Sequence, residues 1–238
     1  MVMTCSGGGG GGPPACATIP YTQDFETGST AMTATTGSQA GATIDSDGAN
    51  SSTYGLHMQG NTSASWSSSY NTGPDAFNNS PAHVASVSRE VCASTDPVVS
   101  VSFDIKQTYT YNPKYCWFRL TINGTPVPDD QGNTYYSATS GDRYGTWKTL
   151  TYDLSAYQGQ DFTIAWEGCM KYYYNYYYEG DNIYVDNISL TQTTNVSPPS
   201  SPGTISGTDY PNQDQTGLTY TVAQGSNVDT YTWSVPSG

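Results

Sequence analysis

Short apolar–polar alternation, broken every few residues by Gly, Asn, Asp or Pro, is the feature that most limits how this chain folds. The stretch VVSVSFDI places Val99, Val101, Phe103 and Ile105 on one side and polar residues on the other. CWFRLTI and FTIAW repeat the same period of two, and HVASVSREV is a weaker example. Successive side chains of a strand point to opposite faces, so this pattern is typical of half-buried strands. No apolar stripe of helical period runs longer than two turns, so we expect an all-β protein, a β-sandwich with very little helix.

The composition of the chain divides it into four parts. Residues 1–14 are rich in glycine, which predicts a flexible leader. The strand pattern fills residues 15–193, and the Pro/Ser-rich stretch NVSPPSSPG predicts a linker at 194–201. Strand-like segments return in residues 202–238, but a complete sandwich of this kind needs about 100 residues. We therefore expect an incomplete second β-domain, and we expect the chain to be a piece of a larger protein.

The charge of the chain excludes several classes of partner. Lys and Arg total 7 against 20 Asp and Glu, for a net charge of −13, and only 11% of the residues are charged. Such a surface repels polyanions, so we expect no nucleic acid partner. No apolar run approaches the ~20 residues of a membrane span. Solubility rests on Ser, Thr, Asn, Gly and Tyr, which is typical of extracellular bacterial β-proteins.

The five cysteines follow no zinc-binding spacing. Four of them lie in the strand-rich region and predict two disulfides in an oxidising compartment, with three connectivities open. We expect Cys116 to pair with Cys169, which would join two apolar strands, and Cys16 to pair with Cys92. Cys5 and the glycines after it are similar to a lipoprotein anchor with its tether, but the residues before Cys5 match a lipobox poorly, so we interpret them as part of the leader.

Several motifs stand in the order found in a known group of domains. IPYTQDFETG and NIYVDNISL bracket the segment, with GLHM and TWKTLTYDLSAYQGQDFTIAWEG between them. Together they resemble jelly-roll (concanavalin-like) sandwiches of the MAM and cleaved-adhesin type, as in secreted surface proteins of Bacteroidetes. The stretch from SPGTISGTDYPN to TYTWSVPSG resembles the first half of a PKD-like, immunoglobulin-like repeat. The resemblance covers residues 16–238 and implies adhesion or glycan binding at a cell surface or outside the cell, without naming a ligand.

The resemblance also implies a structural calcium ion. In such sandwiches the glutamate of an N-terminal FE and the aspartate of a C-terminal DN often share this ion, and here they are Glu26 and Asp186. The alternation of NIYVDNISL slips by one residue at Asp186, which indicates a bulge that re-aims a carboxylate. Calcium takes about six to eight oxygens, so we expect Asp45 and Asp47 of IDSDGANSS to complete the shell. The alternative is that Glu26 and Asp186 are ordinary turn and strand-end acids.

A run of tyrosines before the expected last strand is the candidate ligand-binding site. Its members are Tyr172, Tyr173, Tyr174, Asn175, Tyr176, Tyr177 and Tyr178. If the run continued the preceding strand, its rings would alternate between two faces. It would then be either a hairpin stiffened by cross-strand ring pairs or a platform on which sugar rings stack. Rings in TYTYNPKYCW and NTYYS are expected to extend it.

Motifs for catalysis are missing from the sequence. The two histidines, His57 and His83, have no nucleophile and orienting group in a recognisable pattern. Glu90, Glu167 and Glu179 are isolated, whereas jelly-roll glycosidases place two acids on one strand face. We therefore expect a non-enzymatic adhesion or carbohydrate-binding module of a larger secreted protein. The alternatives are a structural repeat of a surface fibre that makes protein–protein contacts, and an accessory domain of a secreted hydrolase.

Overall fold

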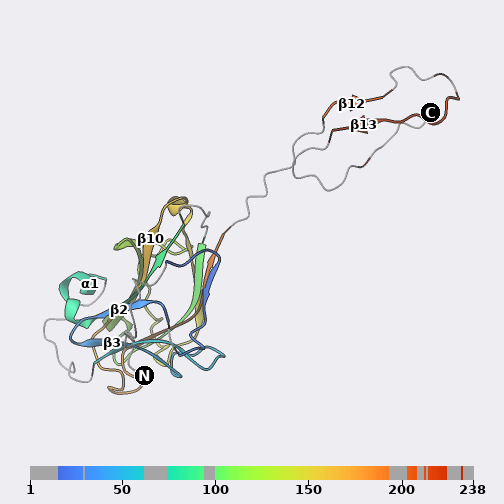
Figure 1. Cartoon of the computed structure of the whole chain (residues 1–238). Helices are drawn as coiled ribbons and strands as arrows, with labels where there is room; N and C mark the ends of the chain where they lie inside the picture. The colour runs from blue at the N-terminus through green and yellow to red at the C-terminus, as the bar shows by residue number, and fades with distance from the viewer. Residues whose placement is uncertain are drawn as a thin grey trace. The chain divides into compact units, whose positions relative to one another are not determined.

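The computed structural model of this chain describes residues 16–28, 30–61, 74–93, 100–192, 203–207, 212, 214–223 and 232. The chain forms two compact units, residues 1–193 and residues 194–238 (Figure 1). In the second unit, β12 (Ile205–Ser206) pairs antiparallel with β13 (Thr221–Val222). The expected leader, 1–14, and the expected linker, 194–201, lie outside the described residues.

Two antiparallel sheets make up the first unit (Figure 1). The six-stranded sheet consists of β1 (Tyr21–Gln23), β3 (Ala40–Asp45), β4 (Gly55–Gly60), β6 (Ser100–Thr108), β9 (Lys148–Asp153) and β11 (Asn182–Thr191). The five-stranded sheet consists of β2 (Thr33–Thr36), β5 (Val84–Val91), β7 (Cys116–Ile122), β8 (Thr125–Val127) and β10 (Phe162–Met170). Their strand orders are β3-β4-β11-β6-β9, with β1 paired to β11, and β2-β5-β10-β7-β8.

The connections between the sheets identify the fold. From β4 to β11 the chain crosses repeatedly from one sheet to the other, and only β7 and β8 follow each other within a sheet. The neighbours β4-β11-β6-β9 and β5-β10-β7-β8 are therefore the two four-stranded halves of a jelly roll. The predicted jelly-roll β-sandwich is confirmed.

Helices are short in the described part of the chain, as the sequence predicts. They are α1 (Ala76–Asn79) and the 3-10 turns η2 (Pro81–His83), η3 (Pro113–Tyr115) and η4 (Ser155–Tyr157). Phe77 of α1 packs in a cluster with Cys169 and Trp117, on the outer face of the five-stranded sheet. None of the described helices has the length and apolar character needed to cross a membrane.

The core lies between the two sheets and uses the faces that the alternation predicts. Val101, Phe103 and Ile105 of β6 are at most 1% exposed, while Val99 lies outside the described residues. The ring of Phe103 lies 5.5 Å from that of Phe118, in the opposite sheet, between ring centroids. Fully burying a side chain of this size contributes about 1.5–3 kcal/mol. Aromatic contacts across the sandwich therefore hold the two sheets together.

Strand β11 contains the bulge that its sequence indicates. Asp186 pairs with Asp104, and the register shifts between Asp186 and Ser189. Asn187 within the bulge has a left-handed φ of 52°. In a regular strand, the apolar residues before and after the bulge would point to opposite faces of the sheet. Because of the shift, both sets face the core. The shift also leaves the Asp186 side chain fully buried.

The loops gather at two opposite ends of the sandwich. Met170 of β10 pairs with Cys116 of β7, and Asn182 of β11 pairs with Thr108 of β6. Loops 109–115, 128–147 and 171–181 therefore meet at one end, where β6, β8 and β10 finish. The turn after β7 and the connection from β9 to β10 lie at the other end.

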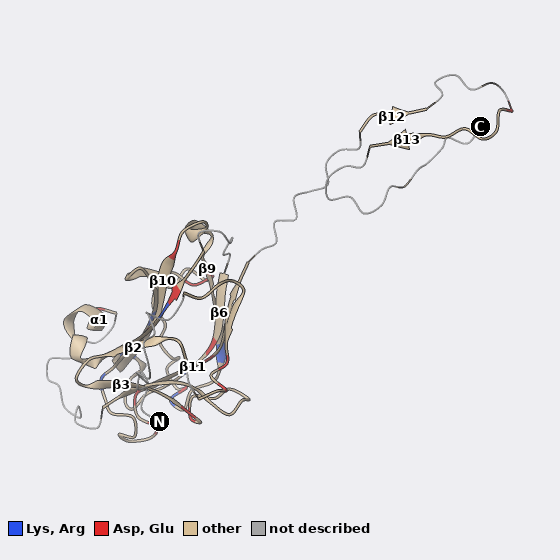
Figure 2. Cartoon of the chain, viewed as in Figure 1, with Lys and Arg blue, Asp and Glu red and all other residues tan. Residues whose placement is uncertain are grey.

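Few blue Lys and Arg segments are visible on the sandwich in Figure 2, as expected for a chain with 7 of them.

Candidate functional site

The segment 171–181, which we call the tyrosine loop, is a series of turns and not a strand. The Tyr176 N–H donates to the carbonyl oxygen of Tyr173 at 3.0 Å, which closes a local turn. Tyr177 and Tyr178 have left-handed φ angles of 39° and 57°. Such angles are uncommon for bulky residues and cost on the order of 1–3 kcal/mol each. The run therefore does not continue the preceding strand, and its rings do not alternate between two faces as they would in a strand.

Two buried polar side chains where the loop enters β11 hold it in place. Asp181 is 0% exposed, and its carboxylate accepts the N–H groups of Thr110 at 2.9 Å and Tyr172 at 3.0 Å. Burial raises the pKa of Asp181 to about 7, although these two hydrogen bonds lower it. The side-chain amide of Asn182 donates to the carbonyl oxygen of Tyr174 at 3.0 Å. Neither anchor was predicted, because the sequence around them gives no sign of burial.

The loop divides its rings into a packed and a displayed set. Tyr172 is 8% exposed and stacks on Tyr176, with ring centroids 5.2 Å apart and an interplanar angle of 8°. The half-buried members are Tyr173 and Tyr176. The exposed members are Tyr174, Asn175, Tyr177 and Tyr178. The candidate ligand-binding run thus supplies both the support and the surface of one site.

Rings from two neighbouring loops extend the displayed set. Tyr111 is 53% exposed, and its ring lies 6.2 Å from Tyr176 and 6.0 Å from Tyr177. Tyr144 is 60% exposed and meets Tyr178 edge-on at 6.4 Å. Tyr177 and Tyr178 are themselves more than half exposed. We call Tyr111, Tyr144, Tyr177 and Tyr178 the tyrosine patch.

The stretches expected to extend the run do so only in part. TYTYNPKYCW contributes Tyr111 to the patch and places Tyr115 against Tyr172, at 5.7 Å. NTYYS does not contribute, because Tyr135 packs on Phe77 under α1. Tyr144 was not predicted as part of the site, since a lone tyrosine among loop residues carries no local signal.

A chain of hydrogen bonds links the tyrosine loop to β3 across the outer face of the six-stranded sheet. His57 Nε2 lies 2.8 Å from Asn182 Oδ1, and His57 Nδ1 lies 3.0 Å from Asp45 Oδ2. The Asn182 amide nitrogen already donates to carbonyl oxygens, so its oxygen is an acceptor. Both nitrogens of the buried His57 ring therefore face acceptors. Burial raises the pKa of Asp45, but the hydrogen bond and charge of His57 outweigh it and lower that pKa to about 2.

The four acids expected to bind calcium all lie in the loop at residues 46–54 or contact it, in two separate groups. Asp45 and Asp47 form the first group with His57, and their ligand atoms lie within 4.8 Å of one another. The Asp45 carboxylate also accepts the N–H groups of Asp47 and Gly48, which shapes the start of the loop. Calcium prefers oxygen ligands alone, so the imidazole makes this group a poor match for that ion.

Glu26 and Asp186 form the second group and hold the end of the same loop. The Asp186 carboxylate accepts the Asn50 N–H at 2.8 Å and the Ser52 hydroxyl at 2.7 Å. Glu26 Oε1 accepts the Thr53 N–H at 2.9 Å. These partners are donors that satisfy the carboxylates directly, and a cation would have to share or replace them. Calcium binding by these residues stays a prediction.

The cysteines form one of the two expected disulfides. Cys16 and Cys92 are joined, with their Cα atoms 5.4 Å apart. The expected pairing of Cys116 with Cys169 is wrong. Cys169 is directly paired with Trp117, the neighbour of Cys116, so the two cysteines point to opposite faces of the sheet. One side chain is buried in the core and the other under α1.

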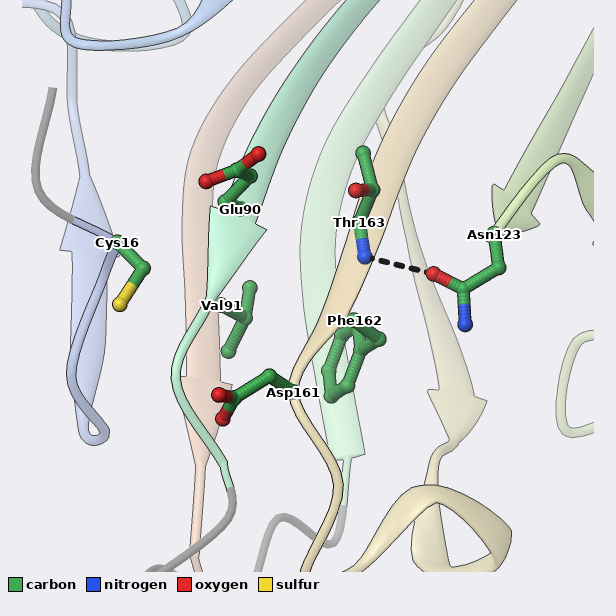
Figure 3. Close-up of a pocket in the computed structure, with 7 residues that line it drawn as sticks. All are labelled: Cys16, Glu90, Val91, Asn123, Asp161, Phe162 and Thr163. Carbon is green, nitrogen blue, oxygen red and sulfur yellow. Dashed lines mark hydrogen bonds between the residues drawn. The ribbon is translucent and has the colours of Figure 1, made fainter. Parts of the chain in front are cut away.

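A pocket of about 300 Å³ lies at the end of the sandwich opposite the tyrosine loop (Figure 3). Its lining residues are Cys16, Glu90, Val91, Asn123, Asp161, Phe162 and Thr163. The Thr163 N–H donates to Asn123 Oδ1 at 2.9 Å, as the dashed line in Figure 3 shows. Phe162, the aromatic residue among them, is only 4% exposed. Because no ring face is displayed here, the tyrosine patch is the better candidate site.

Groups suited to catalysis are engaged in structural contacts. His57 and His83 are 3% and 2% exposed, and His83 Nδ1 bonds the Met170 carbonyl oxygen at 2.9 Å. Glu167 forms an ion pair with Arg119 at 2.6 Å. The four rings of the tyrosine patch, each more than half exposed, present ring faces and hydroxyl groups to a ligand.

Comparison with a family of known domains concerns the second unit. A family model described as a PKD-like domain matches residues 198–238, less than half of the chain. No curated protein sequence matches the chain.

Solved structures with a similar fold include an adhesin domain and carbohydrate-binding modules. The K1 cleaved adhesin domain of Lys-gingipain from Porphyromonas gingivalis W83 is 14% identical, covering 74% of this chain and 99% of that one, with a TM-score of 0.43. A family 61 carbohydrate-binding module, solved with β-1,4-galactotriose, is 14% identical over 71% and 94%, with a TM-score of 0.40. A family 11 carbohydrate-binding module from Clostridium thermocellum is 16% identical over 68% and 88%, with a TM-score of 0.36. At such low values the likeness concerns the sandwich alone.

Proposed function

We propose that this chain is an extracellular, non-catalytic glycan-binding module and that the tyrosine patch is its binding surface. One observation carries the proposal. Four tyrosine rings, each more than half exposed, are displayed together, and the loop with two of them is held by hydrogen bonds to buried side chains. An exposed aromatic surface of this kind usually marks an interaction site.

The patch matches the chemistry of a sugar. A pyranose ring has an apolar C–H face, which stacks on an aromatic ring, and peripheral hydroxyls, which exchange hydrogen bonds with tyrosine hydroxyls. Tyrosine gives a large contact area at low conformational cost, because it has only two side-chain torsions. Stacking on one aromatic side chain is worth about 1–3 kcal/mol in nucleic-acid complexes, which are the nearest measured analogue.

The support of the patch favours binding over a purely structural role. Tyr177 and Tyr178 are held in left-handed conformations, and such strain persists only where the surroundings over-determine it. Hydrogen bonds with Asp181, Asn182 and Thr110 in the interior hold the loop in this conformation. One of them runs from the Thr110 hydroxyl to a carbonyl oxygen of the loop, at 2.7 Å. A loop ordered before the ligand arrives loses less entropy on binding.

Replacing two patch rings tests the proposal. We expect Tyr111→Ala combined with Tyr177→Ala to weaken binding to glycans found on an array at least tenfold, since two stacking contacts are lost and about 1.4 kcal/mol is a factor of ten. The melting temperature should change little, because both rings are largely exposed. Tyr54→Ala is the matched control, as Tyr54 is 38% exposed and lies outside the patch. Titration calorimetry and thermal melts measure the two effects.

Two results would contradict glycan binding by the patch. A lower melting temperature with unchanged binding by the remaining folded protein would make the rings structural. Unchanged glycan binding with loss of self-association in light scattering would make the patch a protein–protein contact of a surface fibre.

A further inference from the structure

Cations are rare in this chain, yet three of them lie on the loops that carry the tyrosine patch. The chain has 7 Lys and Arg against 20 Asp and Glu. The guanidinium carbon of Arg143 lies 4.0 Å from the ring centroid of Tyr178, a patch residue. Lys171, at the start of the tyrosine loop, has its Nζ 4.2 Å from the ring of Tyr115. Lys114, beside Tyr115, is exposed. Three of the seven cations therefore stand on or next to the loops that carry the patch.

The two arginines of the five-stranded sheet have structural contacts. Arg119 forms an ion pair with Glu167 and lies over the ring of Phe77 at 4.2 Å. Arg89 donates to the carbonyl oxygen of Ala31 at 2.8 Å and sits near the opposite end of the sandwich. Neither is placed to meet a ligand on the patch.

The carboxylates near Arg143 leave its guanidinium available. Asp142 is turned toward Thr146, accepting its N–H at 3.2 Å and its hydroxyl at 3.3 Å. Glu179, next to Tyr178, is exposed. Among the described residues, no carboxylate oxygen lies within 4.0 Å of the Arg143 guanidinium. A cation held over a ring face keeps its charge and its N–H donors, so Arg143 retains its capacity to bind an anion.

We propose that the tyrosine patch binds an acidic polysaccharide, with Arg143 receiving a carboxylate of a uronic acid unit and Lys171 adding positive charge. This inference rests on the proposed glycan-binding function. The planar fork of arginine matches a carboxylate with two parallel hydrogen bonds, while the neighbouring rings stack on the sugar. A net charge of −13 disfavours an anionic chain elsewhere on the surface, so recognition of such a ligand depends on cations placed at the site itself.

A matched pair of polymers isolates the role of charge. The full chain is titrated with polygalacturonic acid and with its methyl ester, which has the same backbone without the carboxylates. We expect the acid form to bind at least tenfold more tightly, because about 1.4 kcal/mol is a factor of ten and charge-assisted hydrogen bonds reach this size. Arg143→Gln should remove most of the preference. Arg89→Gln makes the same change in net charge at the other end of the sandwich and should preserve it, with thermal melts confirming that both variants fold.

Each other outcome has a definite meaning. Equal binding of acid and ester, or binding of neutral glycans only, overturns the acidic ligand and leaves the glycan platform standing. Loss of the preference in Arg89→Gln, or its retention in Arg143→Gln, overturns the assignment to Arg143. Equal binding of poly-glutamate shows attraction of any polyanion and overturns sugar recognition. Binding of no polysaccharide, acidic or neutral, overturns the inference together with the proposed function.

Discussion

At Asp181, burial and hydrogen bonding act on one carboxylate in opposite directions. Burial favours the protonated form and raises the pKa to about 7, while backbone N–H groups of Thr110 and Tyr172 favour the charged form. These donors belong to two different loops, so one side chain ties the tyrosine loop to the loop after β6. Asp181, which holds the tyrosine loop in place, is thus fully buried.

The raised pKa of Asp181 predicts a pH-dependent stability. Below about pH 4 the group is protonated in both the folded and the unfolded state. Between about pH 4 and the folded pKa of about 7, the unfolded chain loses the proton and the folded chain keeps it. The unfolding free energy should therefore fall as pH rises through this window, by at most about 1.4 kcal/mol per pH unit for one proton.

Comparison with Asp181→Asn checks this prediction, because the amide does not titrate. Urea unfolding at several pH values should show that the difference between wild type and variant changes across the window and levels off above about pH 7. Asp45 does not contribute to the change in this window. Its pKa is lowered to about 2, so the unfolding free energy that it contributes is lost only as pH falls below about 4. Parallel curves for the two proteins from pH 4 to 8 would show that Asp181 does not titrate in this way.

Regular elements were predictable from the sequence, whereas the loops that make the site were not. Period-two alternation identified β6, β7 and β10 and their inward faces, and the parity slip identified the bulge in β11. The tyrosine run has no such signal, because its conformation depends on the buried Asp181 and Asn182, which also bond to Thr110 and His57 in segments distant in sequence. The wrong disulfide has another cause, because the alternation was not applied to Cys169. Cys116 has the parity of the inward Phe118, whereas Cys169 is out of phase with the inward Trp166 and therefore lies on the outer face.

The loop at residues 46–54 is the element on which the calcium prediction depends. A bound ion should raise the unfolding free energy by mass action, by about 2.7 kcal/mol when its concentration is 100 times the Kd, and the melting temperature should rise with it. Melts of metal-stripped protein in EDTA and in millimolar calcium measure this shift. Asp186→Asn should abolish it, while Asp75→Asn, an exposed acid outside the loop, should preserve it. Identical melts in the two buffers would leave Glu26 and Asp186 as acids that hold the loop by hydrogen bonds alone.

At the scale of the molecule, the proposed binding surface and the disulfide lie at opposite ends of the sandwich. The Cys16–Cys92 disulfide lies where β5 ends and β10 begins, and the tyrosine loop lies where β10 ends. The bonded cysteines are separated by 76 positions in sequence, a span that includes β1 to β5. The bond thus restrains nearly half of the sandwich without touching the patch.

Removing this disulfide should lower stability and spare the binding surface. A cross-link that closes a loop of this length restricts the unfolded chain and typically contributes about 2–4 kcal/mol. Cys16→Ser combined with Cys92→Ser should therefore lower the midpoint of urea unfolding, and dithiothreitol should lower the midpoint of the wild type while leaving that of the variant unchanged. Glycan affinity at temperatures where the variant is folded should match the wild type, because Asp181 and Asn182 anchor the patch at the far end of β10. If affinity fell together with stability, the patch would depend on the whole sandwich and not on its local anchors.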